Sequence, residues 1–388
     1  MDKKRRFCFF HSADRHNDEV LVYRLSDALL KEGWETVFVV NDNEPDETIH
    51  NLKFTGTGRE KKKGHFLRTL VAPFQMYKKL RSVDADVYET WCLDQMLTCL
   101  LLKIHGKRVV FQLREEHPYT FFGEYGGDNT AKKKEITWKK KLVFHLIWFF
   151  MKVTLRRMDY VFATGDDEGQ ILKEMGVKKY VIHGNFPFVN WDFKLSLDDY
   201  LKREDRVIYY GTIYGISCQE FMLEALNHID GVKYLLAGSF RNNAFYREKL
   251  QKMPAWSKVE FVNGFKLSDL PGMLGRSTIS NVLRDFFKTH YHQGNVGVIK
   301  MFESMEAALP LICPDVPVYR AIWEKYKFGI LVDPTNVKQI EDAIRYLVEN
   351  KEEAYRMGQE GRRAVIEKYS WDIVSKEYAE IIDNVYNV

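Results

Sequence analysis

Short runs of apolar residues alternate along the chain with longer stretches in which apolar residues recur every three or four positions. The short runs predict strands and the longer stretches predict amphipathic helices. In the first half, strands are expected at 7–11, 35–40, 86–90, 109–113 and 160–163, and helices at 20–31, 95–104 and 168–175. In the second half, strands are expected at 207–210, 234–237 and 259–262, and helices at 218–228, 246–253 and 267–274. This alternation indicates βαβ units with parallel sheets.

The alternation is interrupted at residues 186–205, which fit neither period and are therefore interpreted as a linker. The length of 388 residues is two to three times the size of a common domain, which agrees with one domain on each side. We expect an α/β protein with two Rossmann-like, doubly wound parallel-sheet domains at 1–185 and 206–369, followed by a helix at 370–388. Ligands of such sheets bind at the carboxyl ends of the strands, so the expected site is a cleft that the two domains face.

The chemistry is most concentrated in residues 294–310, GNVGVIKMFESMEAALP, where a glycine-containing loop runs into a helix expected to begin near Gly297. The N-terminus of a helix offers backbone N–H groups and the positive end of the dipole, which suit a diphosphate. Lys300 adds a positive charge in the first turn. Glu303 lies on the same helix face and can accept two hydroxyls, such as those of a ribose. The alternative is a capped surface helix with an ion pair between Lys300 and Glu303.

The motifs of this half, in their order and spacing, resemble retaining, nucleotide-sugar-dependent glycosyltransferases of the large group-1 family, which have the GT-B fold. The subgroup variant K-x-F-E-x-M is matched by Lys300, Phe302, Glu303 and Met305. The resemblance covers nearly the whole chain. It rests further on VIYYGTIYGISCQEFMLEAL (207–226), LLAGS (235–239), VEFVNGFKLSDLPGML (259–274), FGILVDPTNVKQIEDAI (328–344) and, in the first half, residues 85–118, which resemble a segment that ends in D-x-H-E in many relatives.

The chain departs from the family pattern at several functional positions. Asn295 stands where the family has the first of two glutamates, and Ser217 stands where a basic residue follows the first glycine turn. In the D-x-H-E segment, Arg114 replaces the histidine and Gln112 the aspartate, while Glu115 is retained. An arginine can bind phosphate bidentately, but it cannot serve as a general base near pH 7. These departures change residues expected to act in catalysis and remove one expected diphosphate contact, at Ser217, while donor binding is still expected.

The resemblance implies transfer of a sugar from a nucleoside-diphosphate sugar to an acceptor hydroxyl, with retention, through an oxocarbenium-like state and without a metal or cofactor. It also implies that the helix at 370–388 crosses back to the N-terminal domain. The main task of the enzyme is then to stabilise the departing diphosphate. The candidate catalytic residues are Asn295, Glu303 and Arg114; the candidate donor-binding residues are Gly211, Thr212, Ser217, Phe265, Val298, Ile299, Lys300 and Glu303; and the candidate acceptor-side residues are Asp14, Arg15 and Glu115.

Simpler interpretations stay open for some of these residues. Phe265 is as readily a core residue as part of a base pocket, and Asp14 and Arg15 could merely precede and cap the next helix. His290 and His292 could be two ligands of a metal site, but we interpret them as part of a polar loop because no third or fourth ligand is apparent. Two rival functions also remain: a nucleotide-sugar epimerase with the same fold, and a non-catalytic nucleotide-sugar-binding relative.

Charge is unevenly distributed, although the net charge of the chain is only +4. Residues 59–81 and 132–157 together hold 17 Lys and Arg against two acids, interleaved with apolar residues such as the run at 142–153. This pattern favours an anionic membrane surface, while nucleic acid is not expected. The alternative is that 142–153 is a buried helix with solvated basic ends. The five cysteines form no C-x-x-C pair, and with no apparent signal peptide we expect a cytoplasmic protein at the inner membrane face, acting on a glycan or lipid-linked acceptor.

Overall fold

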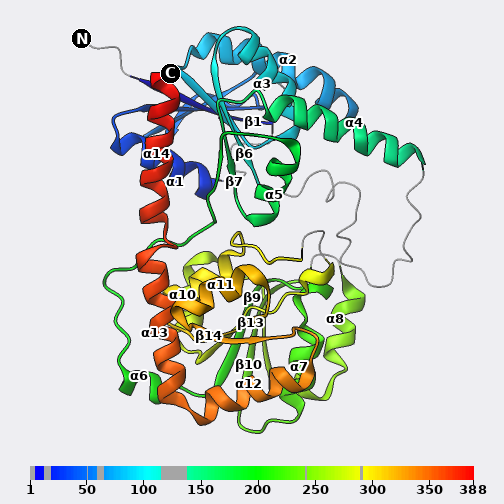
Figure 1. Cartoon of the computed structure of the whole chain (residues 1–388), viewed down its shortest axis with the longest axis vertical. Helices are drawn as coiled ribbons and strands as arrows, with labels where there is room; N and C mark the ends of the chain where they lie inside the picture. The colour runs from blue at the N-terminus through cyan, green and yellow to red at the C-terminus, as the bar shows by residue number, and fades with distance from the viewer. Residues whose placement is uncertain are drawn as a thin grey trace. The chain divides into compact units, whose positions relative to one another are not determined.

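The computed structural model describes residues 5–388 except 13–18, 50, 59–64, 115–137, 241–242 and 289–291. The chain forms two compact units (Figure 1). Of the described residues, those within 5–114, 138–183 and 372–388 form the first unit, and those within 184–371 form the second. Each unit is an α/β structure built on a mostly parallel sheet, which confirms the predicted fold class.

The first unit is built on an eight-stranded sheet with the order β3-β4-β2-β1-β5-β6-β7-β8. Its strands are β1 (Arg6–His11), β2 (Glu35–Val40), β3 (Glu47–Ile49), β4 (Leu52–Gly56), β5 (Val87–Thr90), β6 (Arg108–Leu113), β7 (Tyr160–Ala163) and β8 (Tyr180–Ile182). Only β3 at one edge is antiparallel to its neighbour among these strands. The central strands β1 and β2 are almost entirely buried, as expected for a parallel sheet covered on both faces.

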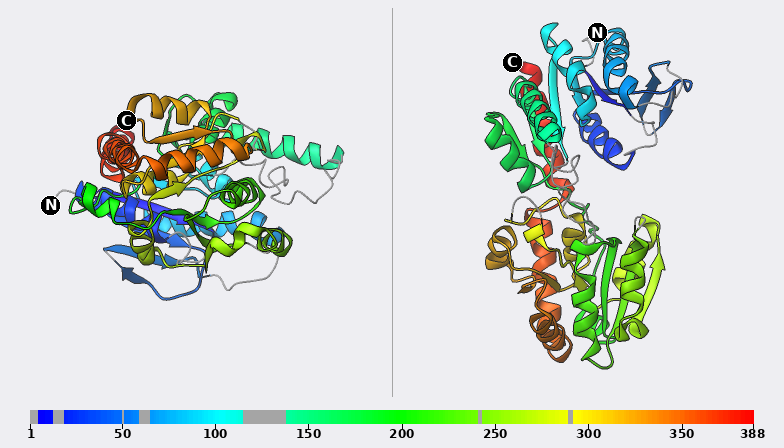
Figure 2. Two further views of the ribbon diagram at one scale, coloured as in Figure 1. Left: turned by 90° about the horizontal axis from the view of Figure 1, so that it is seen from below. Right: turned by 90° about the vertical axis from the view of Figure 1, so that its right-hand side faces the viewer.

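The helices of the first unit are α1 (Glu19–Lys31), α2 (His65–Val83), α3 (Met96–Ile104), α4 (Trp138–Leu155), α5 (Asp166–Met175) and, from Asp372 onward, α14 (Trp371–Asn387). The last of these is bound to the start of the chain, because the Asp383 carboxylate accepts hydrogen bonds from Arg5 and Trp34, each at 2.8 Å. The N-terminal part of α4 projects away from the sheet of this unit (Figures 1 and 2).

The second unit is built on a six-stranded, parallel sheet with the order β11-β10-β9-β12-β13-β14. Its strands are β9 (Arg206–Thr212), β10 (Lys233–Ser239), β11 (Val259–Asn263), β12 (Ile279–Asn281), β13 (Leu311–Pro314) and β14 (Gly329–Val332). Its helices are α6 (Leu197–Leu201), α7 (Gln219–Asn227), α8 (Ala244–Gln251), α9 (Leu270–Gly275), α10 (Ile299–Glu306), α11 (Pro317–Tyr326), α12 (Val337–Glu349) and α13 (Lys351–Glu367). The segment that the sequence predicts to be a linker, 186–205, lies in this unit and contains α6.

Strand β9 supplies both faces of the core of the second unit. Successive strand residues point to opposite faces, so Val207 and Tyr209 pack into one buried cluster while Ile208 and Tyr210 pack into the other. The helices that cover these faces show the matching helical period. In α12 the buried positions are Ile340, Ala343, Ile344 and Leu347, which form one stripe.

The strands and helices expected from the hydrophobic pattern are all present, with bounds within a few residues of those predicted. The pattern missed β3, β4 and β8, which lie at the two edges of the first sheet. In the second sheet it missed β14, at one edge, and β12, which is a central strand beside β9 but has only three residues. A strand of this length is too short to show a period, and it becomes recognisable only by its neighbours in the sheet.

Candidate functional site

The carboxyl end of β9 forms a turn that only glycine fits. Gly211 has a φ of +113°, in the region that side chains disfavour. Its neighbour on β10, Gly238, has a φ of +148°, and a Cβ there would lie 1.8 Å from the Gly211 carbonyl oxygen. A Cβ on Gly211 would lie 3.2 Å from Nζ of Lys300. The two glycines therefore let the strand end approach both its neighbour and the lysine closely.

Lys300, in the first turn of α10, points into this turn. Its ammonium donates a hydrogen bond to the Tyr209 hydroxyl at 2.9 Å and lies 4.1 Å from the centre of that ring. The side chain is half-buried. Burial lowers the pKa of Lys300 to about 8, while Tyr214 and Glu303 favour its charged form and the Arg284 charge disfavours it. The result is a cation that has lost much of its hydration and is placed at a strand end, where an anionic ligand would stabilise it.

Glu303 lies one helical turn after Lys300 and is half-buried. Its charge acts on the Tyr210 hydroxyl, whose pKa is raised well above the usual range by burial and then by this carboxylate. The same hydroxyl donates to the Lys300 carbonyl at 2.8 Å. Lys300 and Glu303 are thus each tied to a tyrosine of β9, which is different from a solvated ion pair on a surface helix.

The loop before α10 is held in shape by Asn295. Its side-chain oxygen accepts a hydrogen bond from the Gly297 backbone at 2.6 Å, and its carbonyl accepts one from the Tyr319 hydroxyl at 3.2 Å. Helix α10 follows with Val298 at its N-cap, where the Val298 side chain makes no capping hydrogen bond. The first backbone N–H groups of a helix have no partner within it, so this end can bind an anion. Lys300 lies in that same turn.

A second cation, Arg284, lies at the same edge and was missed from the sequence. It follows β12, and its guanidinium donates to the Tyr214 hydroxyl at 3.2 Å. Its charge acts on both Lys300 and Tyr209. The sequence does hold a signal for Arg284, because it directly follows the run 279–283, which is buried in the structure. The signal depends on identifying part of that run as a central strand, which the hydrophobic pattern does not do.

Residues 200–364 match the family model described as glycosyl transferases group 1. This part of the chain belongs to the group-1 glycosyl transferases. The match runs from α6 into α13 and includes all six strands of the second sheet as well as α10. The family expected from the motifs is therefore confirmed, while the K-x-F-E-x-M subgroup stays a prediction. A comparison with curated proteins finds no match.

Solved structures with the same fold extend over both units. Sucrose-phosphate synthase from Thermosynechococcus elongatus has a TM-score of 0.74 at 15% identity, covering 99% of this chain and 100% of that one. HepE from Anabaena, in complex with UDP and glucose, has a TM-score of 0.70 at 11% identity, covering 97% and 99%. A UDP-N-acetylglucosamine 2-epimerase from Listeria monocytogenes, assigned provisionally, has a TM-score of 0.61 at 13% identity, covering 99% and 97%. These likenesses show the fold alone, which transferases and an epimerase share.

The two other residues predicted to bind the donor near β9 differ in what their side chains do. Ser217 is only 3% exposed, and its hydroxyl donates to the Tyr214 carbonyl at 2.6 Å and accepts from the Tyr214 N–H at 3.2 Å. The hydroxyl is therefore turned into its own loop. Thr212 ends β9, half-buried, and its carbonyl accepts from the Tyr209 hydroxyl at 2.6 Å. Direct contact of either residue with a donor stays a prediction.

Phe265 lies just after β11 and is partly buried against the cluster that contains Tyr210. The two rings meet edge to face, with 6.4 Å between their centres. One side of Phe265 therefore belongs to the core of the group-1 domain, in line with the simpler interpretation of this residue. A role for its other side in a base pocket stays a prediction.

Four site residues were predicted on the first unit, and the structure describes only Arg114, which takes the place of the histidine in the D-x-H-E pattern. Asp14, Arg15 and Glu115 lie outside the described residues. Arg114 directly follows β6, and its guanidinium carbon lies 5.9 Å from the centre of the Trp91 ring. It stands at the carboxyl end of its strand, the edge at which ligands of parallel sheets bind, and its catalytic role stays a prediction.

Beside Arg114, a buried acid is bound on both oxygens. Glu89 of β5 accepts hydrogen bonds from Gln112 at 2.6 Å and from the Tyr378 hydroxyl of α14 at 2.7 Å. Burial raises the pKa of Glu89 to about 8, although those hydrogen bonds and the Arg114 charge act in the opposite direction. Gln112, which replaces an aspartate of the family pattern, thus donates to this acid.

No group of three or more potential ligands suited to a metal ion occurs in the part of the chain that the structure describes. His290 lies outside that part, and His292 Nδ1 lies 3.0 Å from the Phe286 carbonyl oxygen.

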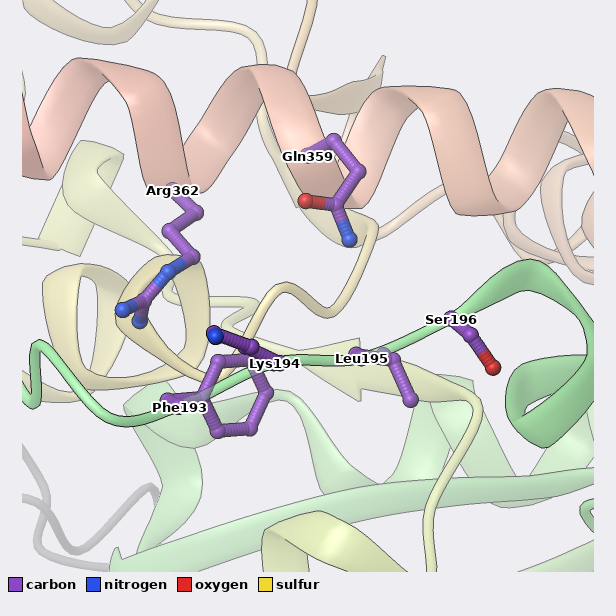
Figure 3. A pocket seen from close by; sticks show the side chains of 6 residues that line it. All are labelled: Phe193, Lys194, Leu195, Ser196, Gln359 and Arg362. Atoms are coloured by element: carbon purple, nitrogen blue, oxygen red, sulfur yellow. The ribbon is translucent and has the colours of Figure 1, made fainter.

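A cavity of about 330 Å³ lies away from the predicted donor residues. Figure 3 shows the six residues that line it, Phe193, Lys194, Leu195, Ser196, Gln359 and Arg362. Arg362 is bound there to Glu306 and to the Asn190 carbonyl, so it fastens the segment to α10.

Helix α4 presents apolar side chains to solvent along most of its length. Its exposed apolar residues are Trp138, Leu142, Val143, Leu146, Phe149 and Phe150, with Trp138 71% and Phe149 66% exposed. Met151, Thr154 and Leu155 at its other end are buried. The alternative of a buried helix therefore fits only this last turn. Among the described residues, no helix is long and apolar enough to cross a membrane.

Proposed function

We propose that the protein is a retaining glycosyltransferase that moves a sugar from a nucleoside-diphosphate sugar to an acceptor hydroxyl. The observation that carries this proposal is the position of Lys300, half-buried against the Gly211 turn and bonded to Tyr209. A partly dehydrated cation in the first turn of a helix, packed against a glycine turn, suits the charge of a diphosphate. The group-1 family of residues 200–364 supports the same donor class.

In the proposed reaction, the bond between the anomeric carbon and the diphosphate oxygen breaks, and its electron pair leaves with the diphosphate. Lys300 and the Ile299 N–H stabilise that growing negative charge, whereas the Val298 N–H, a further candidate, already donates to the Asn295 carbonyl at 3.4 Å. Glu303 accepts the ribose hydroxyls, and Asn295 binds a sugar hydroxyl. No metal is required for these roles, because the positive charge comes from the protein.

The acceptor oxygen then bonds to the anomeric carbon on the face that the diphosphate leaves, which gives retention. Its proton needs a base on that face. Arg114 cannot accept it at neutral pH. We therefore assign that proton to the oxygen of the departing diphosphate, and we assign Arg114 to binding a phosphate or another anionic group of the acceptor.

We propose further that the acceptor is part of a cell-surface polysaccharide or a lipid-linked glycan at an anionic membrane. Beyond Trp138, the exposed apolar residues of α4 follow the three consecutive lysines Lys139, Lys140 and Lys141, and Lys152 lies near the other end of the helix. A helix with exposed apolar residues and flanking lysines suits the boundary between anionic headgroups and acyl chains. Such binding would bring a lipid-linked acceptor to the first unit.

The donor is tested by incubating the protein with a panel of UDP-, GDP-, ADP- and dTDP-sugars and identifying the products. Transfer to an added acceptor or slow hydrolysis, with release of the diphosphate, supports a glycosyltransferase. An epimerised donor with its diphosphate still attached would show the rival epimerase, and tight binding without turnover would show a non-catalytic relative.

The site is tested by Lys300→Ala and Glu303→Ala, both of which we expect to abolish transfer. The matched control is Arg320→Ala. Arg320 lies on α11 of the same unit and forms an exposed ion pair with Asp315, which precedes that helix. Near-wild-type turnover in both site variants would show that α10 does not bind the donor.

Membrane binding is tested by flotation with vesicles of phosphatidylcholine alone or with phosphatidylglycerol. We expect binding to the anionic vesicles only, lost in a Leu146→Ser, Phe149→Ser double variant. A control pair on the second unit is Phe245→Ser and Leu267→Ser, which are also exposed apolar residues. Equal flotation of both double variants would show that α4 is not the membrane contact.

A further inference from the structure

We propose that Arg284 supplies the second positive charge for the donor diphosphate, replacing the basic residue that the family has at the position of Ser217. This inference rests on the proposed function, because it needs a diphosphate at α10. Its chemistry is that of a planar guanidinium binding two phosphate oxygens, beside Lys300 as a point charge.

The sheet order places Arg284 at the correct edge. Strand β12 lies parallel to β9, with Ile279 opposite Val207 and Ser280 opposite Ile208. Carboxyl ends of parallel neighbours meet at one edge, so the residues after β12 emerge beside the turn after β9. Arg284 is the third residue beyond Asn281, the last residue of β12.

Two hydrogen bonds fix the loop of Arg284 to the turn that follows β9. The Asp285 backbone N–H donates to the Ile216 carbonyl at 2.9 Å. The Arg284 guanidinium donates to the Tyr214 hydroxyl at 3.2 Å. Both acceptors belong to residues 214–217, the turn in which the family carries its basic residue. The guanidinium thus lies beside the position that Ser217 leaves without a charge.

The two cations of this edge are close enough to repel each other. The Arg284 charge adds to burial in lowering the pKa of Lys300. Two like charges in a half-buried place raise the free energy of the empty site unless an anion lies between them. A diphosphate is such an anion, and its binding would relieve the repulsion. This repulsion has no evident use in a surface that binds nothing.

A buried network holds both loops in place behind the cations. Asn281, the last residue of β12, donates to the Tyr234 hydroxyl at 2.9 Å. That hydroxyl donates to the Gln219 side chain, which in turn donates to the Ser217 carbonyl at 2.6 Å. The network joins the strand before Arg284 to the turn beside it, so the guanidinium has little freedom to lose on binding.

The test measures binding of UDP, GDP, ADP and dTDP by isothermal titration calorimetry, and then compares the best of them with its monophosphate and nucleoside. We expect Arg284→Ala to weaken diphosphate binding about tenfold to a hundredfold and nucleoside binding less than about threefold. Arg284→Lys should recover part of the loss. The matched control is Arg276→Ala, because Arg276 precedes β12 at its opposite end and pairs with Glu260.

The variant Tyr214→Phe distinguishes a structural role of Arg284 from direct binding of the diphosphate. It removes the hydrogen bond between the two side chains but keeps the guanidinium. Little loss of diphosphate binding in Tyr214→Phe supports the proposal, and a loss equal to that of Arg284→Ala overturns it. Unchanged diphosphate binding in Arg284→Ala, while Lys300→Ala abolishes it, also overturns the role of Arg284 but leaves the proposed function standing. If the wild-type protein binds none of the four diphosphates, both proposals fail.

Discussion

The carboxyl edges of the two sheets each hold an ionisable group whose pKa is shifted by burial to about 8, in opposite directions. Glu89 of the first unit is raised to that value, and Lys300 of the second is lowered to it. Both groups would therefore be largely protonated near neutral pH, which makes the acid neutral and the lysine charged. The same pKa thus leaves the acid uncharged and the lysine cationic.

The difference lies in what surrounds the two groups. Glu89 is completely buried, and Gln112 and Tyr378 donate one hydrogen bond to each of its oxygens. Lys300 is only half-buried and faces a turn without side chains at Gly211. The chain itself completes the surroundings of the acid, whereas the lysine stays partly exposed to solvent. A shifted pKa alone does not identify a binding site; partial exposure in the first turn of a helix is the second observation that points to one.

The largest expected effect is a loss of catalytic activity when the lysine at the edge of the second sheet is replaced. Lys300→Met should lower kcat/KM for the preferred nucleotide sugar at least about a hundredfold, since it removes the charge that stabilises the leaving diphosphate. It should not lower the Tm of the free protein, because a partly dehydrated charge is removed. Turnover and thermal denaturation measure the two quantities. Lys338→Met, an exposed pair with Asp342, is the control, and a lower Tm in Lys300→Met alone would make the lysine structural.

The converse result is expected at the other edge. Glu89→Ala should lower the free energy of unfolding of the first unit by about 3 kcal/mol, because it leaves two buried donors without an acceptor. Hydrogen exchange followed by mass spectrometry should show the loss of protection in β5, β6 and α14, with β9 and β10 unchanged. Glu35→Ala, at a partly exposed ion pair with Arg6, should cost less than about 1 kcal/mol. Loss of protection in both units would contradict the expectation that Glu89 stabilises only the first unit.

The raised pKa of Glu89 also predicts the direction of a pH effect. The folded state holds this proton up to about pH 8, while the unfolded chain releases it near 4.5, so the stabilising contribution is complete below 4.5 and is lost as the pH rises through 8. Denaturation of the first unit should therefore show a loss of up to about 1.4 kcal/mol per pH unit within that window. Glu89→Gln should flatten this dependence, and an unaltered slope in that variant would assign it to another group.

The smallest effect concerns ligand binding at the second edge. Lys300 loses its proton near pH 8 in the free protein, so the affinity for the diphosphate should fall as the pH rises above that value. Titration calorimetry from pH 7 to 9.5 should show a decrease approaching tenfold per pH unit. Lys300→Arg, which keeps its charge in this range, should remove the decrease. A decrease that persists in the arginine variant would point to a different titrating group.

The buried strands made most of the fold predictable. Runs such as 7–11 and 207–210 are continuous and apolar, which is how strands inside a covered parallel sheet appear, and Gly176 and the short turns set off the helices between them. Strand β12 was not predicted because three residues carry no period. It belongs in the sheet because β9 and β13 pair with it on either side, and those contacts are distant in sequence.

The candidate site was predictable where one segment carries it. Lys300, Glu303 and Asn295 fall within nine residues, and the helix between them follows from local pattern. Arg284 was missed because its relation to the Gly211 turn exists only through the pairing of β12 with β9. The inward direction of the Ser217 hydroxyl was also beyond the sequence, since it depends on the conformation of a single turn.

The bond between Tyr378 and Glu89 has a consequence for the order in which the protein is made. A ribosome synthesises Glu89 early, but residues 372–388 emerge only after the whole second unit. Until then, the nascent first unit has an incomplete edge and a buried acid without its tyrosine. The unit that is translated second is therefore the first to have all of its residues, and the unit that is translated first is complete only when residues 372–388 have been added.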